Sequence, residues 1–510
     1  MTEYQGNITI NTDGMSAPQL SATMWENRAA AYQMYDGPSN PLCTIAVLAY
    51  NRPQKTRYCV ECILRYTADV DYELLLIDNG SDEEILKIFE AVSYDRKRIV
   101  RITKNIGAGY AWRTARDLFS GKYLVIVSND VYVTKNWLSN LLKCYESDPR
   151  IGFVEPVSSN VSNLQQVDLS YTDFDDMQEK AAAYNQSDPS QWEERMRLIS
   201  LISIFSRPVL DIVGISDPAF PHDFIEDDFS TRLRRSGYKL MLCRDTWICH
   251  DHDFFNYEDK DPAAFRVSLD TGREIYRNKY HSIDGWDDIL NFEFALLAPL
   301  YTHDFPGGII SALVADGRCG APALELRNLL KKVGVTDVEL RAFTTKAKYF
   351  ADLQTVCESV DCDRIAYIRS HYTNEAFDVI ALCGPINCYP EPFEVLKDVY
   401  SLLKPGGILL FKLRNAFTQR TLNRCLGLGA SEAPDADMPG IIPFEIVTAV
   451  LERLGGRDIA INMETPYMDQ AAMAVAMESL RAGNPAVTQQ SLNEFITNNY
   501  VFNVVRGERA

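Results

Sequence analysis

The sequence predicts an α/β protein with two doubly wound sheets, one in each half of its 510 residues. Short apolar runs alternate with segments of helical periodicity, which is typical of β-α-β units with right-handed crossovers. The composition changes near Trp286, and a second β-α-β series begins at Gly308. A chain of this length also exceeds one ordinary hydrophobic core. We therefore expect two Rossmann-like domains.

The elements of the first half follow one another in regular order. Residues 1–40 are polar and are interpreted as an N-terminal extension with a short helix at 24–34. Polar residues then dominate 160–191, which predicts an inserted loop region over the site. The expected strands are 44–49, 72–77, 98–103, 123–127, 198–205, 238–243 and 246–249, and the expected helices are one carrying Cys59 and Cys62, one over 82–92 and one opened by Gly107-Ala108-Gly109.

The second half begins with a connection. Residues 287–297 are predicted as a linking helix, and strands follow at 308–310, 377–383 and 407–413. The predicted boundaries are 1–40 for the extension, 41–285 for the first domain, 286–300 for the linker helix and 301–510 for the second domain.

Composition excludes several classes of protein. The net charge of −19 disfavours a nucleic-acid binder, because phosphate neutralisation needs clustered Lys and Arg. No apolar run reaches the length of a membrane span, and the first residues lack a secretory signal. The 12 cysteines are scattered, which indicates a reduced, cytoplasmic protein. Cys59 and Cys62 form a CxxC without a second pair at zinc spacing, so we expect a structural role.

Acidic residues stand where predicted strands end. Asp78 follows one apolar run, Asn129 and Asp130 follow another, and Glu226-Asp227-Asp228 form a third group downstream. Open α/β sheets bind ligands at the carboxyl ends of their strands. Carboxylates there suit a divalent cation, and such a cation suits a diphosphate. The pattern favours an enzyme that handles a nucleotide-linked substrate.

These motifs keep the order of a known family. Residues 42–285 resemble a family 2 glycosyltransferase of the GT-A fold, a Rossmann-like fold for nucleoside diphospho-sugars. The matching segments are 49–52, 77–81, 104–109, 128–131, 154–157, 225–238 and His250. The resemblance covers nearly half of the chain and implies metal-dependent transfer of a sugar with inversion.

The resemblance also implies roles for single residues. Asp78 would accept a hydrogen bond from uracil or thymine, so a UDP- or dTDP-sugar is favoured. Asp130 and His250 would bind Mn²⁺ or Mg²⁺, although Ser128 or Asn129 replaces the first Asp of the family's DXD motif. The implied donor-binding residues are Ala49, Tyr50, Asn51, Arg52, Asp78, Asn105, Gly107, Gly109, Asn129 and Asp130.

The acidic group at 226–228 supplies the candidate base. Inversion needs a carboxylate that takes the proton of the acceptor hydroxyl. Registering the family motif on Phe229 and Arg232 places Glu226 in the base position, and Asp227 is the alternative if the register shifts by one. The same acids also suit a helix N-terminus, where they would favourably face the helix dipole.

Residues 300–510 resemble a class I SAM-dependent methyltransferase. The match rests on 377–382, on 402–410 with its Lys404-Pro405-Gly406-Gly407, and on the tail at 499–506. The glycine-rich cofactor motif is incomplete, since Leu313, Ala315 and Cys319 stand at its acidic and glycine positions. We therefore predict a degenerate domain that serves packing, oligomerisation or partner docking, with SAM binding as the alternative.

The expected function is a cytoplasmic glycosyltransferase, working at the inner face of the membrane or free of it. The acceptor would be a glycan, a lipid-linked sugar or a protein in bacterial surface polysaccharide or glycoprotein synthesis, and this expectation rests on family analogy. Two alternatives remain: a bifunctional glycosyltransferase and methyltransferase, and a non-catalytic scaffold.

Overall fold

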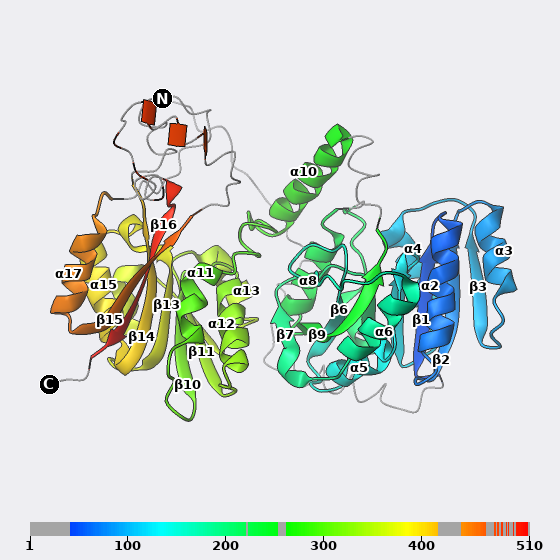
Figure 1. The fold of residues 1–510 in the computed structure, drawn as a ribbon, viewed down its shortest axis with the longest axis horizontal. Coiled ribbons are helices and arrows are strands. Elements are labelled where there is room, and N and C mark those ends of the chain that lie inside the picture. The colour runs from blue at the N-terminus through cyan, green and yellow to red at the C-terminus, as the bar shows by residue number, and fades with distance from the viewer. Residues whose placement is uncertain are drawn as a thin grey trace, which may run out of the picture.

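The computed structural model describes residues 41–220, 223–252, 262–416, 440–465 and 496–507, with scattered residues between 474 and 493. They form two α/β bodies side by side, and helix α10 (Pro262–Lys279) projects between them (Figure 1). The predicted extension, with its helix at 24–34, lies outside the described residues. No described helix is both long and apolar enough to cross a membrane.

The first body contains the expected parallel sheet. Its strand order is β3-β2-β1-β4-β8, and only β8 runs antiparallel to its neighbour. The strands are β1 (Cys43–Ala49), β2 (Tyr72–Asn79), β3 (Lys97–Ile102), β4 (Tyr123–Ser128) and β8 (Ile202–Ser206), and the crossover helices are α2 (Pro53–Tyr66), α3 (Glu83–Ala91) and α4 (Ala108–Leu118).

A smaller sheet completes this body. The segments predicted as two strands at 238–249 form one long strand, β9, which pairs with β5, β6 and β7. Its strands are β5 (Val131–Tyr132), β6 (Ile151–Ser158), β7 (Trp192–Arg195) and β9 (Lys239–His250), and the accompanying helices are α5 (Trp137–Tyr145), α6 (Phe174–Tyr184), the 3₁₀ turn η1 (Pro189–Gln191), α7 (Arg207–Val213) and α8 (Ile225–Arg235).

Two predictions about connections need correction. The stretch 160–191 is not all loop, because Asp173 caps helix α6 by accepting the backbone N–H of Asp176. The linker helix expected at 287–297 is helical only over α11 (Phe294–Leu297), which the 3₁₀ turn η2 (Ala298–Tyr301) continues. The carboxylate of Asp284 accepts the N–H groups of Trp286 and Asp287, so this segment begins as a turn.

The second body is built on a seven-stranded sheet of order β12-β11-β10-β13-β14-β16-β15. Strand β16 lies antiparallel between β14 and β15, as in the class I methyltransferase fold. The strands are β10 (Ile310–Ala315), β11 (Val338–Thr344), β12 (Ser359–Cys362), β13 (Phe377–Pro385), β14 (Leu403–Arg414), β15 (Gly456–Glu464) and β16 (Asn499–Arg506), and the helices are α12 (Ala321–Lys332), η3 (Ala347–Tyr349), α13 (Phe350–Leu353), η4 (Ile365–Tyr367), α14 (Ile368–His371), η5 (Ile386–Cys388), α15 (Pro392–Ser401) and α17 (Phe444–Arg453).

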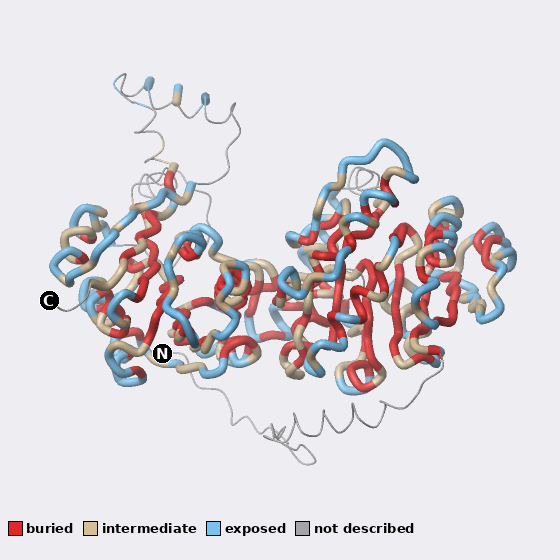
Figure 2. The backbone as a smooth tube through the Cα atoms, turned by 60° about the horizontal axis from the view of Figure 1, so that its bottom comes forward, coloured by how far each residue is buried: buried red, intermediate tan, exposed pale blue. Residues whose placement is uncertain are grey.

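The buried core follows the strands of both bodies (Figure 2). Strand β2 is buried along its whole length, as expected for a parallel strand covered on both faces. The predicted fold, a GT-A domain followed by a second Rossmann-like domain of methyltransferase type, is confirmed. The rigid strands position the ends at which the site residues lie.

Candidate functional site

Three parallel strands of the first sheet end at one edge. Ala49 at the end of β1 lies in register with Asp78 of β2, and Leu48 lies in register with Ser128 of β4. The segments that follow these strands, 50–52, 79–81 and 129–130, are therefore neighbours. This is the edge at which open α/β sheets bind ligands.

The turn between β1 and α2 brings Arg52 to Asp130. Asn51 and Arg52 both have left-handed backbone, with φ of 54° and 56°. The guanidinium of Arg52 donates to Asp130 Oδ2 at 2.8 Å. Asn129 instead donates its amide to the carbonyl of Asn51 at 3.3 Å and to the hydroxyl of Thr56 at 2.9 Å. Asn129 thus fixes the turn, and Asp130 alone faces the site.

The loop after β2 fixes the segment expected to approach a nucleotide. Asp78 is buried and accepts the backbone N–H of Ser81 at 2.8 Å. A Cβ on Gly80 would overlap the backbone nitrogen of Asn105, and the φ of Gly80 is 76°, so this close approach requires glycine. The side-chain oxygen of Asn105 accepts the N–H of Gly107 at 2.8 Å.

The two glycines at the start of α4 differ in their surroundings. Gly107 has a φ of 82°, and no heavy atom lies within 4 Å of the position its Cβ would take. A Cβ on Gly109 would instead lie 3.4 Å from Ile225 at the start of α8. Gly107 therefore borders open space, whereas Gly109 lies where α4 packs against the start of α8.

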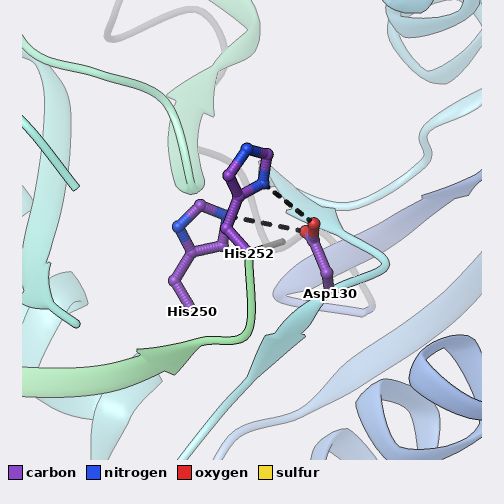
Figure 3. A group of neighbouring side chains, drawn as sticks. All are labelled: Asp130, His250 and His252. Carbon is purple, nitrogen blue, oxygen red and sulfur yellow. Dashed lines mark ion pairs between the residues drawn. The ribbon is translucent and has the colours of Figure 1, made fainter. Parts of the chain in front are cut away.

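Asp130, His250 and His252 converge on one point (Figure 3). The antiparallel pairing of β5 and β9 places Val131 opposite His250, and the N–H of Asp251 donates to the backbone oxygen of Asp130 at 2.9 Å. Alternate residues of an extended chain project to one side. Asp130 Oδ1 lies 3.7 Å from His250 Nε2, and Oδ2 lies 3.6 Å from His252 Nδ1.

The surroundings prepare these three side chains to bind a cation. Nδ1 of His250 donates to the carbonyl of Asn160 at 2.9 Å, which leaves the lone pair of Nε2 facing Asp130. Burial lowers the pKa of His250 and so favours its neutral, ligating form. Burial opposes ionisation of Asp130, but the hydrogen bond from His252 and the charge of Arg52 act in the other direction, and the pKa of Asp130 is lowered. The group fits a divalent metal ion.

The acids at the start of α8 have three different environments. Asp228 is fully buried and bonded to Arg232, Lys279 and Tyr280, which is a structural role. Asp227 is also buried, and its Oδ1 lies 2.9 Å from Nε of Arg197. Burial raises the pKa of Asp227 to about 6 against the charge of Arg197, and the charge of Glu226 adds to the increase. Glu226 is half-buried and has no hydrogen-bond or ion-pair partner among the described residues.

A cavity of about 250 Å³ opens beside Glu226. Its polar side chains include the carboxylates of Asp223, Glu226 and Asp227 and the guanidinium of Arg197. The apolar lining residues are Ala108, Trp112, Phe205, Ile215, Phe224, Ile225, Phe229, Leu269 and Trp286. The cavity therefore lies between the start of α4 and the start of α8, with apolar walls and an excess of acidic groups.

The corresponding edge of the second sheet is closed by the chain itself. Asp316, directly after β10, accepts the N–H and the hydroxyl of Thr345 at 2.7 and 2.9 Å and the hydroxyl of Tyr389 at 2.6 Å. The Tyr389 hydroxyl occupies the space that a Cβ on Gly384 would need, at the end of β13. The contact between Asp316 and Tyr389 joins the ends of β10 and β13, the point where the strand order reverses, and the contacts with Thr345 join the ends of β10 and β11.

A second contact closes the edge at β14. Lys412 donates to both carboxylate oxygens of Glu293, at 2.8 and 2.7 Å, and Glu293 directly precedes α11. After β11, where the methyltransferase family places an acid for the ribose hydroxyls, this chain has Thr345 and Lys346. The residues at this edge do not fit SAM.

Sequence reasoning missed two residues of the site. His252 has one available signal, since His250-Asp251-His252 places two histidines on one side of a strand end. Arg197 has none, because it reaches Asp227 only through the fold. The CxxC cysteines lie inside α2, and burial raises the pKa of Cys62 to about 12, which agrees with a structural role.

The first domain is similar to a known protein family. Residues 44–191 match the model of the family described as "Glycosyl transferase family 2". A search of the curated proteins finds no match.

Three solved structures illustrate the remote similarities. The mannosyltransferase PcManGT from Pyrobaculum calidifontis, in complex with GDP-Man and Mn²⁺, is 14% identical over 66% of this chain and 82% of that chain, with a TM-score of 0.34. A SAM-dependent methyltransferase from Archaeoglobus fulgidus is 17% identical over 50% and 100%, with a TM-score of 0.29. The SeMet-substituted CurJ carbon methyltransferase is 16% identical with a TM-score of 0.28, over 40% of this chain and half of the length of that one.

The sheet order, the ligand edge and the convergent carboxylate and imidazole groups define a GT-A domain with a candidate metal-binding site. The family match specifies the class further: residues 44–191 form a family 2 glycosyltransferase domain. A second domain of methyltransferase fold follows it in the same chain.

Proposed function

We propose that the protein is a metal-dependent, inverting glycosyltransferase that uses a nucleoside diphospho-sugar, with UDP- or dTDP-sugars favoured. The observation that carries the proposal is the convergence of Asp130, His250 and His252 at the edge where β1, β2 and β4 end. Of the two expected ions, a carboxylate and two imidazoles at that edge suit Mn²⁺ better than Mg²⁺, which prefers oxygen ligands. Such an ion, when bound, neutralises the charge that develops on the leaving diphosphate.

The chain's own residues bind the donor in this proposal. Asp78 accepts a hydrogen bond from the base, since among the described residues only one of its two oxygens is engaged, by the N–H of Ser81. The backbone at Ala49 and Tyr50 lies beside the base edge. Arg52 stands next to Asp130 and adds a positive charge near the diphosphate.

Glu226 is the proposed general base. It removes the proton from the acceptor hydroxyl as that oxygen attacks the anomeric carbon and the nucleoside diphosphate departs. Two observations favour it over Asp227: Glu226 has no hydrogen-bond or ion-pair partner within the part of the chain that the structure describes, and Asp227 is held against Arg197.

The cavity also indicates the class of acceptor. Three carboxylates and one guanidinium line it, so a phosphorylated or carboxylated acceptor group would meet repulsion. Apolar and aromatic walls suit the carbon face of a sugar ring. The proposed acceptor is an uncharged hydroxyl on a glycan, a lipid-linked sugar or a protein, in bacterial surface polysaccharide or glycoprotein synthesis.

A thermal-shift panel tests the proposal. UDP, GDP, dTDP and CMP and their sugars are added to the full-length protein with and without Mn²⁺. A ligand at about 100 times its Kd adds about 2.7 kcal/mol of stability, which is easily measured. We expect a Mn²⁺-dependent shift with a uracil or thymine nucleotide, followed by slow hydrolysis of the matching sugar nucleotide. Absence of any shift would contradict the proposal.

A further inference from the structure

The helix that carries the acids is joined at its other end to the second domain. Arg234 and Arg235, at the carboxyl end of α8, both reach Asp352 in α13. Nη2 of Arg234 lies 3.2 Å from Asp352 Oδ1, and Nη2 of Arg235 lies 2.7 Å from Oδ2. Asp352 is fully buried, and Arg234 is 3% exposed. Two guanidinium groups of the first domain therefore share one buried carboxylate of the second.

Arg234 of α8 also contacts the segment that contains Met196 and the residue Thr355, which follows α13. Its Nε donates to the carbonyl of Met196 at 2.9 Å, and its Nη1 donates to the hydroxyl of Thr355 at 3.2 Å. Met196 is the residue before Arg197, whose side chain pairs with Asp227. The contact with Asp352 thus fixes both α8 and the segment that brings Arg197 to the first turn of that helix.

The geometry of a helix transmits this restraint. Glu226 precedes Arg234 by eight residues, which is about 12 Å along the helix axis. No side chain caps the N-terminus of α8, where Phe224 has a φ of 67°. A displacement of about 1 Å in a reacting group can reduce a rate about 100-fold. The anchored carboxyl end therefore helps to set the position of Glu226.

We propose that the second domain positions the catalytic helix of the first, with Asp352 as the positioning residue. The inference rests on the proposed function of Glu226. It gives the methyltransferase-fold domain a role that needs no cofactor, in agreement with the closed edge of its sheet. Because removal of one partner from a buried ion pair leaves uncompensated charges, Asp352→Asn should loosen α8.

The interface supplies a matched control. Glu194 of β7 faces Arg327 of α12, 3.6 Å away in the same domain interface, and neither residue belongs to α8. The variant Glu194→Gln removes an interdomain ion pair without touching the helix. A milder test variant is Arg235→Gln, because the Arg235 side chain is 28% exposed and Arg234 would keep its contact with Asp352.

Three properties are measured on the full-length protein with the donor found in the nucleotide panel. They are the steady-state rate of sugar transfer, the rate of donor hydrolysis, and the hydrogen exchange of the backbone amides of residues 225–235. For Asp352→Asn we expect the transfer kcat to fall at least tenfold and the donor KM to stay within twofold of wild type. The rate of donor hydrolysis should fall less than the rate of transfer, and the amides of α8 should exchange faster. Arg235→Gln should show the same changes to a smaller extent. Glu194→Gln should lower the melting temperature and leave transfer kcat within twofold.

Several results would contradict the proposed role of Asp352 or of the site itself. Unchanged transfer and unchanged exchange in Asp352→Asn would overturn the inference, as would an equal fall in the Glu194→Gln control. If Asp352→Asn does not fold, Arg235→Gln decides by the same criteria. A wild type without donor turnover would contradict the proposed function, and the exchange data would still decide whether Asp352 restrains α8.

Discussion

Asp130 and His250 face each other across the antiparallel pair β5 and β9, with Oδ1 and Nε2 3.7 Å apart. This spacing is set by backbone pairing, because Val131 lies opposite His250 in the ladder. The hydrogen bond from Nδ1 to Asn160 fixes the ring. The two side chains are therefore oriented by the fold itself, and His252 extends the pair to the three candidate ligands of the proposed metal site.

The first prediction concerns this metal site. Asp130→Asn and His252→Ala should each weaken Mn²⁺ binding by on the order of 100-fold or more, since even outer-shell changes cost 10- to 100-fold. The measurement is the Mn²⁺-dependent thermal shift. His371→Ala is the control, because His371 also lies beside carboxylates, those of Asp361 and Asp363, but in the second domain. A shift that survives in Asp130→Asn would disprove the site.

The second prediction separates the two candidate bases. Glu226→Gln should lower transfer kcat by about 100-fold or more and leave the donor KM unchanged, because general base catalysis contributes about that much. Asp227→Asn should have a smaller effect, since the carboxylate of Asp227 is almost fully buried and paired with Arg197, although it also lines the cavity. Steady-state kinetics of both variants at one pH decides. A larger loss in Asp227→Asn would assign the base to Asp227.

Much of this site follows from the sequence, because its residues stand at the ends of apolar strands. The strand ends place Asp78 and Asp130 at one edge, and the family order adds His250. His252 depends on how far β9 continues to pair with β5, which composition does not specify. Arg197 reaches Asp227 from a loop, and no local sequence pattern predicts this contact.

Helix α10 contains a residue that the sequence alone does not explain. Gly272 stands within α10, and glycine disfavours a helix interior. Phe224 and the backbone of Asp223 lie so close that a Cβ at Gly272 would press against both. The glycine is therefore required by packing between distant segments. The helix expected at 287–297 fails for the opposite reason, because the side chain of Asp284 locally favours a turn.

The third prediction follows from the raised pKa of Asp227, about 6 in the folded protein against an ordinary 3.8. The folded state holds this proton to higher pH than the unfolded state, so the wild type loses stability as the pH rises between these values. Asp227→Asn does not titrate there. Its free energy of unfolding relative to wild type should increase by about 2 kcal/mol from about pH 4 to pH 7.

Denaturation of both proteins across this pH range provides the measurement. The loss of the partner of Arg197 in Asp227→Asn adds a penalty that does not depend on pH, so the slope and not the absolute difference is diagnostic. A difference that stays constant with pH would show that Asp227 has an ordinary pKa.

The fourth prediction concerns the second domain. Tyr389 and Thr345 already engage the carboxylate of Asp316, and Lys412 is paired with Glu293, so SAM would have to break contacts at both sides of the sheet edge. We expect neither SAM nor its demethylated product to shift the melting temperature of the full-length protein at about 1 mM. At that concentration, a ligand with a Kd of about 10 µM would add about 2.7 kcal/mol of stability.

The variant Tyr389→Ala should be less stable than wild type, because it leaves a gap against Gly384. It should still not bind SAM, because Thr345 and Lys346 offer no carboxylate to the ribose. The nucleotide-dependent shift of the first domain, measured on the same preparations, shows that the protein is folded. A shift with SAM in the wild type would make the protein bifunctional, and a shift in Tyr389→Ala alone would show that the tyrosine is what closes the edge.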